Sequence, residues 1–290
     1  MAGQIDVNKN QSKLNRLQTE LPAGLLASAS WLRERGYYRQ LLDHYVSSGW
    51  LESPARGVYR RPGTPLKWQH VVTSLLLTEK LPLHIGGATA LEHAGFGHYA
   101  RMRGAEAIKL FGPPRLPAWA RALPVPEKFV VRNDAMFDSL PVPRVHLDAD
   151  GNPTANSQQV SAAVLAENGL QVSRWGESDW PLVYSTGERA ILEMLQDVPE
   201  AESVYQAHVM LQGMVNLRPV LMSLLLRHCG SIKAKRLFLA LAERRGHAWF
   251  AHLDLSGVDL GKGKRALHPG GKLDAKYQIT LPADIDDHAR

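Results

Sequence analysis

The sequence has a single cysteine and no long hydrophobic run. Because Cys229 is the only cysteine in 290 residues, the chain cannot close a disulfide on itself, and we expect a reducing compartment. Cys229 lies in the apolar stretch from Leu221 to Gly230, which favours a small buried side chain over a nucleophile or a metal ligand. No apolar run approaches the roughly 18 residues of a membrane span, and the polar segment from Met1 to Leu17 lacks the apolar core of a signal peptide. These absences predict a soluble, cytoplasmic protein that does not associate with membranes.

Signatures of catalysis and of metal binding are missing as well. The chain has no G-x-S-x-G elbow, no P-loop, no H-E-x-x-H and no cysteine–histidine spacing of a zinc site. His84, His93 and His98 are close in sequence, but their spacing matches no helical zinc motif. Glu193 and Asp197 lie four residues apart on a predicted helix, where such a pair usually faces solvent and needs burial or a metal ion to do chemistry. The sequence therefore predicts neither an enzyme nor a cofactor or metal site.

Basic residues, by contrast, are concentrated near both ends of the chain. The formal net charge is +6, a modest excess that suits a polyanionic partner. Residues 1–62 carry nine lysines and arginines against five acids, and residues 227–276 carry eleven against four. A length of 290 residues suits two domains. We therefore expect two basic regions, one in each domain.

The N-terminal basic region has the order of elements of a helix-turn-helix. Leucines at helical spacing between Leu14 and Leu21 predict a first helix that ends at Pro22. A second short helix, from Trp31 to Arg35, is predicted to begin at a serine cap and to stop at Gly36. A third helix is predicted from about Tyr38 to Ser48. Helix, short helix, glycine turn and helix is the helix-turn-helix order.

A predicted β-hairpin follows this third helix. Trp50 to Glu52 and Val58 to Arg61 read as strands on either side of a turn, and Pro62-Gly63 ends the unit. Such a hairpin is typical of a wing. The sequence thus predicts a winged helix-turn-helix domain over residues 1–66 and a second domain over residues 67–290. The flanking leucine periodicity favours Tyr45 and Trp50 as core residues rather than base-stacking ones.

In such a domain the third helix enters the major groove by its N-terminal end. Side chains predicted to lie near base edges are those of Tyr37, Tyr38, Arg39 and Gln40, with His44 one turn further on. Side chains predicted to meet phosphates or an adjacent minor groove are those of Ser30, Arg33, Arg56, Arg60 and Arg61. One alternative stays open, because many winged helices contact only proteins and arginines on a hairpin often form a solvated face.

The middle of the chain predicts an α+β domain with a mostly antiparallel sheet. An amphipathic helix over residues 68–76 precedes a short strand at Leu83 to Ile85, a glycine turn at Gly86-Gly87 and a helix over residues 88–94. Strand-like runs follow at residues 108–111, 129–132 and 144–147, between proline-rich connections. Gly86-Gly87 lacks the spacing of a dinucleotide fingerprint or a P-loop, so we expect close backbone packing there.

The last third predicts a cluster of helices. Ser185 and Glu188 have the spacing of a capping box, Ser203 can cap a second helix, and Pro219 fits the first turn of a third. A fourth helix, residues 231–245, is closed by Gly246.

The fourth helix is apolar nearly all round, so we expect it to be buried apart from a basic strip made by Lys233, Arg236 and Arg244. Strands are predicted at residues 247–255 and 277–281. The connection between them adds three further basic residues, Lys262, Lys264 and Arg265. This basic cluster suits DNA wrapping or an acidic partner, or is a solvated charged face.

Several stretches closely resemble AbiEi-type antitoxins of abortive-infection toxin–antitoxin systems. The N-terminal helix-turn-helix and Gly86-Gly87-Ala88-Thr89-Ala90-Leu91 resemble the first part of that family. Six further stretches resemble, in order, the C-terminal region of that family. They are Gly187-Glu188-Arg189-Ala190-Ile191, Leu217-Arg218-Pro219, Lys235-Arg236-Leu237-Phe238-Leu239, His247-Ala248-Trp249, Asp259-Leu260-Gly261-Lys262-Gly263-Lys264-Arg265 and Tyr277-Gln278-Ile279-Thr280. None of these stretches is a catalytic signature.

The resemblance implies a bacterial antitoxin with two functions. Its N-terminal domain would bind inverted repeats in duplex DNA upstream of its own operon and repress it. The second domain would counter a cognate nucleotidyltransferase-like toxin, either by binding it or without a stable complex. A different hypothesis is a winged-helix regulator whose larger domain senses a small ligand, which requires a sizeable apolar pocket with convergent polar groups.

Overall fold

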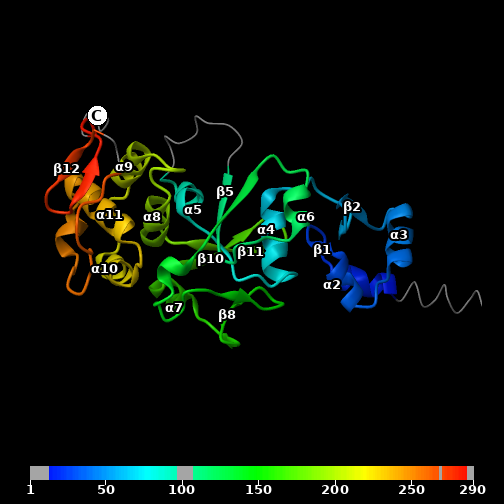
Figure 1. The fold of residues 1–290 in the computed structure, drawn as a ribbon. Helices are drawn as coiled ribbons and strands as arrows, with labels where there is room; N and C mark the ends of the chain where they lie inside the picture. Colours follow the sequence, from blue (N-terminus) through cyan, green and yellow to red (C-terminus); the bar gives the residue numbers. More distant parts are fainter. Residues whose placement is uncertain (1–12, 97–106, 268–269, 286–290) are drawn as a thin grey trace, which may run out of the picture.

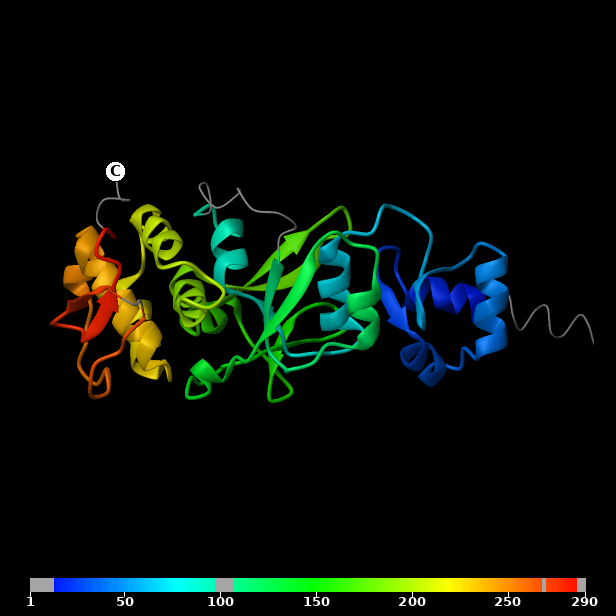
Figure 2. The ribbon, with the colours of Figure 1, turned by 45° about the horizontal axis from the view of Figure 1, so that its top comes forward.

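A computed structural model of the chain describes residues 13–96, 107–267 and 270–285. His98 lies outside these residues. The molecule is elongated, with a small N-terminal unit (residues 13–66) at one end and the last helices and strands at the other (Figures 1 and 2). A five-stranded sheet with helices around it lies between them. We call residues 67–285 the main domain.

The N-terminal unit contains the three helices and the hairpin that the sequence predicts. A helix over residues 13–20 is followed by the elements β1 (Leu26–Ser28), α2 (Ala29–Glu34), α3 (Arg39–Ser47), β2 (Glu52–Ala55) and β3 (Val58–Arg60). Strand β1 was not predicted, and it completes an antiparallel sheet of order β1-β3-β2.

Local chemistry accounts for the ends of these helices. Ser28 caps α2 by accepting a hydrogen bond from the Trp31 amide. Gly36 after α2 and Gly49 after α3 adopt φ of 85° and 73°, which glycine tolerates best. The helices pack on a small core of their own that includes Tyr45, as predicted. Trp50 is 48% exposed, so its predicted place in the core is wrong; it follows Gly49, outside the buried stripe of α3.

Strand β1 also ties the N-terminal unit to the main domain. The Leu26 amide donates to Ser74 Oγ (2.8 Å), and Thr78 Oγ1 donates to the Leu26 carbonyl (3.1 Å). Ser74 lies on α4 (Trp68–Leu77), and Thr78 follows it. The side chains of Leu26 and Val58 are fully buried in the core of the main domain. The two units therefore share a bonded, apolar junction near the predicted boundary at residue 66.

The main sheet is mixed. Its order is β10-β11-β4-β5-β6, with antiparallel pairing of β10 with β11 and of β4 with β5, and parallel pairing of β11 with β4 and of β5 with β6. The five strands are β4 (His84–Ile85), β5 (Ala107–Phe111), β6 (Lys128–Arg132), β10 (Leu170–Trp175) and β11 (Trp180–Ser185). The smaller sheets are antiparallel: β7 (His146–Leu147), β8 (Pro153–Ala155) and β9 (Gln158–Gln159), then β12 (Lys272–Asp274) and β13 (Ile279–Leu281). The described strands are thus mostly antiparallel, as predicted, while both parallel pairings between strands lie in the main sheet.

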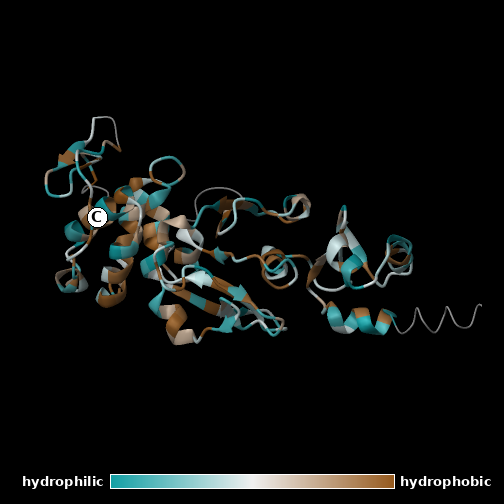
Figure 3. Cartoon of the chain, turned by 60° about the horizontal axis from the view of Figure 1, so that its bottom comes forward, coloured by the Kyte–Doolittle hydropathy of each residue, from teal (hydrophilic) through white to brown (hydrophobic). Residues whose placement is uncertain are grey.

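Helices surround this sheet and continue beyond it. Around the sheet lie α4, α5 (Gly87–His93), α6 (Ala118–Ala122), the 3-10 helix η1 (Ala135–Phe137) and α7 (Ala162–Glu167). The C-terminal cluster consists of α8 (Gly187–Gln196), α9 (Val204–Gly213), α10 (Pro219–His228), α11 (Ile232–Arg245) and the 3-10 helix η2 (Ala248–His252). Helix α8 contacts α5 on one side and α9, α10 and α11 on the other. Much of this cluster is hydrophobic along its helices (Figure 3), as a buried set of helices requires.

Two local predictions in this cluster are wrong. Ser185 does not cap α8, because it is the last residue of β11 and its hydroxyl donates to Glu193. Residues 247–255 form η2 and irregular chain instead of a strand. Trp249 anchors that turn, since its ring is buried and its Nε1 donates to the Met214 carbonyl (2.8 Å). The cap at Ser203, the first-turn Pro219 and the left-handed Gly246 agree with the prediction.

A buried ion cluster centred on Glu193 joins the sheet to α8. The Glu193 carboxylate accepts hydrogen bonds from His84 Nε2 (2.9 Å) and Arg189 Nε (3.0 Å) at one oxygen, and from Ser185 Oγ (2.8 Å) and the Gly87 amide (3.0 Å) at the other. The side chain is 1% exposed. The expectation that the pair Glu193 and Asp197 faces solvent is therefore wrong.

The charges in this cluster compensate each other. Burial by itself raises the pKa of Glu193, but the hydrogen bonds from His84 and Ser185 and the charge of Arg189 outweigh it, so the pKa lies below its ordinary value. Arg189 also donates to the carbonyls of Asn168 and Pro143. A Cβ at Gly86 would lie 2.2 Å from Glu193 Oε2, which confirms the predicted close backbone packing at the glycine pair.

We predict that Glu193→Gln lowers the free energy of unfolding by about 3 to 5 kcal/mol, because it leaves the buried Arg189 without a counter-charge. Urea unfolding of the full chain measures this loss. The control is Glu200→Gln, whose side chain is 73% exposed and pairs with Lys233 at the surface; its effect should stay within about 0.5 kcal/mol. Equal stabilities of the two variants would contradict the role assigned to Glu193.

We also predict that the protein loses stability between pH 7.5 and pH 5.5. Burial lowers the pKa of His70, His84 and His93 below 6.5, and at His84 it outweighs the opposing effect of Glu193. Once the pH falls below 6.5, the unfolded chain binds protons at these residues that the folded chain does not, so unfolding becomes easier. Glu202, whose pKa is raised by burial, opposes the three histidines as a single group. The urea midpoint at the two pH values tests this, and an unchanged or higher midpoint at pH 5.5 would overturn it.

Candidate nucleic-acid interface

Helix α3 presents most of the predicted base-reading residues to solvent. Its buried face consists of Leu41, Leu42 and Tyr45. Arg39, Gln40 and His44 are exposed on the remaining surface, and the Arg39 side chain is 91% exposed. Figure 1 places α3 at the end of the molecule opposite the C-terminus, facing away from the main domain. No described element covers this face, so a flat or convex partner can reach it.

The two tyrosines before α3 have different positions. Tyr37 is 1% exposed, and its hydroxyl donates to Glu20 Oε2 (3.2 Å). Burial and Glu20 raise its pKa to about 12. Its predicted place near base edges is therefore wrong, because the ring belongs to the core of the unit. Tyr38, the residue that precedes α3, is 50% exposed. Lys13 Nζ lies over its ring at 5.0 Å, a cation–π contact that the sequence did not indicate.

On the hairpin, only one of the three predicted arginines is free. Arg60 is 7% exposed; its Nε donates to Glu52 Oε2 (2.8 Å) and its Nη1 to the Thr64 carbonyl. Arg60 thus braces the hairpin, and its predicted phosphate contact is wrong. Arg61 is partly buried and donates to the Gln18 carbonyl (3.1 Å). Arg56, in the turn between β2 and β3, is exposed.

Helix α2 contributes two predicted residues to the same unit. Ser30 and Arg33 are both exposed. Ser30 Oγ lies 2.9 Å from Ser28 Oγ, so its hydroxyl is oriented by the helix cap. Arg35, which was not predicted, stacks on Trp31 with its guanidinium 3.7 Å from the ring. The exposed part of the predicted interface is therefore Ser30, Arg33, Tyr38, Arg39, Gln40, His44 and Arg56.

The second basic region is organised by a buried arginine. Arg236 is 2% exposed, so the predicted basic strip does not include it. Its Nε donates to the Leu260 carbonyl (2.6 Å) and its Nη1 to the carbonyls of Gly263 (2.6 Å) and Gln278 (3.1 Å). The guanidinium on α11 thus binds three backbone carbonyls of the C-terminal segment, of which that of Gln278 also accepts from the Arg265 amide (2.9 Å). Arg236 therefore holds the connection over residues 261–265, which we call the basic loop.

The other predicted basic residues fall into two groups. Lys233 donates to the Val198 carbonyl (2.6 Å), and Arg244 pairs with Asp274 (2.7 Å), so both already have partners within the chain. Lys262, Lys264 and Arg265, the cations of the basic loop, are exposed. The predicted strip along α11 is thus interrupted by the burial of Arg236, whereas the basic loop displays three cations close together in sequence.

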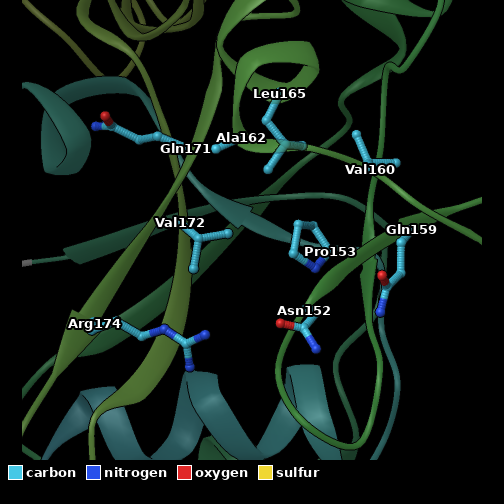
Figure 4. Close-up of a pocket in the computed structure, with 9 residues that line it drawn as sticks. All are labelled: Asn152, Pro153, Gln159, Val160, Ala162, Leu165, Gln171, Val172 and Arg174. Atoms are coloured by element: carbon cyan, nitrogen blue, oxygen red, sulfur yellow. The ribbon is translucent and has the colours of Figure 1, made fainter.

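A hollow of about 470 Å³ lies beside the edge strand β10 (Figure 4). Pro153, Leu165 and Val172 give it apolar walls, and Asn152 and Arg174 extend their polar ends into its lower part in the view of Figure 4. Its lining residues include no carboxylate. The hollow therefore offers a surface for an apolar or anionic group but no acid or base for catalysis.

Of the three histidines singled out in the sequence, the two that the structure describes have structural partners. His84 bonds to Glu193, and the ring of His93 stacks on Tyr184 with centroids 4.1 Å apart. Across residues 13–96, 107–267 and 270–285, no three histidine, cysteine or acidic side chains group in a way that could hold a metal ion. Cys229 is buried, as predicted, and burial raises its pKa to about 11. None of the described helices is long and apolar enough to span a membrane.

Comparison with solved structures shows a similar fold in the RV2827C protein from Mycobacterium tuberculosis. The two are 15% identical, with a TM-score of 0.52, over 92% of this chain and 88% of that chain. A comparison with curated proteins finds no match. Models of protein families match nearly the whole chain. Residues 10–102 match the AbiEi antitoxin N-terminal domain, and residues 105–282 match the AbiEi antitoxin transcriptional regulator of type IV toxin–antitoxin systems. The chain therefore belongs to the AbiEi antitoxins, the transcriptional regulators of type IV toxin–antitoxin systems.

Proposed function

We propose that residues 1–66 are a winged helix-turn-helix domain that binds duplex operator DNA and represses the operon of this antitoxin. The observation that carries the proposal is the uncovered face of α3, with Arg39 and Gln40 exposed near its N-terminal end. An α-helix fits the major groove, and the N-terminal residues of a recognition helix contact base edges. Inverted repeats are the expected operator, since two copies on a palindrome read equivalent half-sites.

The contacts divide into two kinds in this docking. Arg33 near the end of α2 and Arg56 in the turn of the hairpin are exposed and belong to the same unit as α3, which suits them to phosphates beside the groove. Tyr38, Arg39, Gln40 and His44 face the base edges. Arg60 and Arg61 act within the protein, where they hold the hairpin and its return to the first helix.

We further propose that residues 67–290 counter a nucleotidyltransferase-like toxin, directly or functionally. The exposed basic loop, held from inside by Arg236, is the part of this domain best suited to an acidic partner. The hollow beside β10 supports a second candidate function, a regulator that senses a small ligand, because it combines apolar walls with Asn152 and Arg174.

For the DNA-binding proposal, the full chain should bind duplex DNA with an affinity that falls steeply as salt rises, because arginine–phosphate contacts release counterions. Arg33→Ala and Arg56→Ala should weaken binding to all duplexes alike. Arg39→Ala and Gln40→Ala should mainly erode the preference for the operator. Fluorescence anisotropy at two salt concentrations, on operator and scrambled duplexes, measures both effects.

The matched control is Lys272→Ala, which removes one exposed positive charge in the last sheet, far from α3. It should leave affinity and preference unchanged. A salt-independent affinity would contradict the proposal, and so would an equal loss in the control and in the variants of the N-terminal unit.

Repression and rescue from the toxin should be separable by mutation. The triple variant Arg33→Ala, Arg39→Ala and Arg56→Ala should lose repression in a promoter reporter while still rescuing cells from the cognate toxin. Charge reversal of the basic loop, with Glu at Lys262, Lys264 and Arg265, should do the opposite. Point variants are preferable to a truncation after Pro62, because Leu26 and Val58 belong to the core of the main domain.

Lys128→Glu serves as the control for charge reversal, since this lysine is exposed on β6, outside the basic loop. Both activities should survive it. Loss of rescue in the triple variant, with the chain still folded, would mean that the two functions are not separable.

A further inference from the structure

Asp43 occupies the exposed face of α3 next to Arg39. Its side chain is 64% exposed, and its Oδ2 lies 3.9 Å from Arg39 Nε. The two residues are one turn apart on the helix, where Cβ atoms are about 5 to 6 Å from each other. Both lie opposite the buried stripe of Leu41 and Tyr45. Any duplex that meets Arg39 therefore also meets Asp43.

Stability does not explain an acid at this position. An exposed i,i+4 pair with its charged atoms 3.9 Å apart contributes little to folding. In contact with DNA, a carboxylate also opposes the negative field of the phosphates. Asp43 would thus lower affinity for every duplex, unless one particular base pair offers it a hydrogen-bond donor.

Resting on the DNA-binding function proposed above, we infer that Arg39 and Asp43 act as a pair that selects one G·C base pair in each half-site. Arg39 donates to O6 and N7 of the guanine, and Asp43 accepts from the N4 amino group of its cytosine. These are the side-chain pairings that fit the two bases in the major groove. Guanine O6 and cytosine N4 share a Watson–Crick hydrogen bond, so adjacent side chains on one helix face can reach them together.

The geometry of the pair also rejects the other base pairs. The carboxylate beside Arg39 Nε leaves Nη1 and Nη2 free at the end of the side chain for the guanine edge. In an A·T pair, the adenine N6 amino group would meet Arg39, donor against donor, and thymine O4 would meet Asp43, acceptor against acceptor. A reversed C·G pair would place each charge opposite the wrong partner. Asp43 is thus a specificity-determining residue that lowers affinity for all other sequences.

The test is an in vitro selection from a random duplex pool with the full-length wild type and Asp43→Asn. The asparagine keeps the shape of the side chain and removes its charge. We expect the wild type to select a motif with an invariant G·C in each half-site. In Asp43→Asn, Arg39 still reads the guanine, so the preference at that one position should weaken while the rest of the motif is kept. The ratio of affinities for the G·C duplex and its A·T counterpart should fall about tenfold, the order expected for one specific base contact.

The matched control is Glu34→Gln, which removes one negative charge from an exposed residue at the end of α2 in the same unit. It should raise affinity for every duplex, because repulsion of the phosphates is reduced, and it should leave the motif unchanged. Since Asp43 and Glu34 are both exposed, both variants should unfold at the wild-type urea concentration. A change in charge alone therefore cannot imitate the predicted result.

The outcomes separate this inference from the function on which it rests. If the wild type binds no duplex, the proposed DNA binding fails and the inference fails with it. If the wild type selects a motif that Asp43→Asn leaves unchanged, or if the position at which Asp43→Asn weakens the preference is not a G·C pair, DNA binding stands and the role of Asp43 is overturned.

Discussion

The carboxylate of Glu193 lies where α8, β4, β11 and the start of α5 meet, and it accepts a hydrogen bond from each of them. A buried charge is costly unless it is paired and fully hydrogen-bonded. The four donors must therefore be held in place around the Glu193 carboxylate, which constrains the surrounding chain. The carboxylate requires glycine at position 86, a serine at the end of β11 and an arginine one turn earlier on α8. Arg189 then extends the constraint to the carbonyls of Asn168 and Pro143. The sheet and the C-terminal helices are thereby held as one body.

The main domain also fixes the position of the N-terminal unit. Ser74 and Thr78 bond to the backbone of Leu26, while the side chain of Leu26 packs into the main core. The unit with the exposed α3 is therefore docked through a bonded strand rather than carried on a free linker. In a repressor that reads two half-sites, such docking would let the main domain influence the spacing and angle of the two recognition helices. The sequence alone predicted two domains that meet near residue 66, without this shared core.

Two arginines that the sequence placed at interfaces are buried in the structure. Arg60 was predicted to contact DNA because it lies on the predicted wing, and Arg236 was assigned to a basic strip because it shares one arc of the predicted helix with Lys233 and Arg244. In the structure each turns inward, Arg60 to Glu52 and Arg236 to three carbonyl oxygens of the C-terminal segment. Guanidinium groups have five donors in a fixed fork, so they suit this bracing role. The exposed charges of the basic loop lie on a backbone that Arg236 holds through the carbonyls of Leu260 and Gly263.

The sequence by itself determined the local elements and the family. Periodic leucines, serine caps and glycines predicted the N-terminal helices, the hairpin and the four C-terminal helices, because these depend on contacts within a few residues. Only the tertiary structure decided which polar side chains are exposed. Glu193 bonds to residues 84, 87 and 185. Tyr37 is buried in the core with its hydroxyl bonded to Glu20, and β1 pairs with β3. Burial of a charged or aromatic side chain depends on contacts distant in sequence, which local periodicity does not encode. The exposure of Asp43 beside Arg39, on a face of α3 that no described element covers, is likewise a property of the tertiary structure.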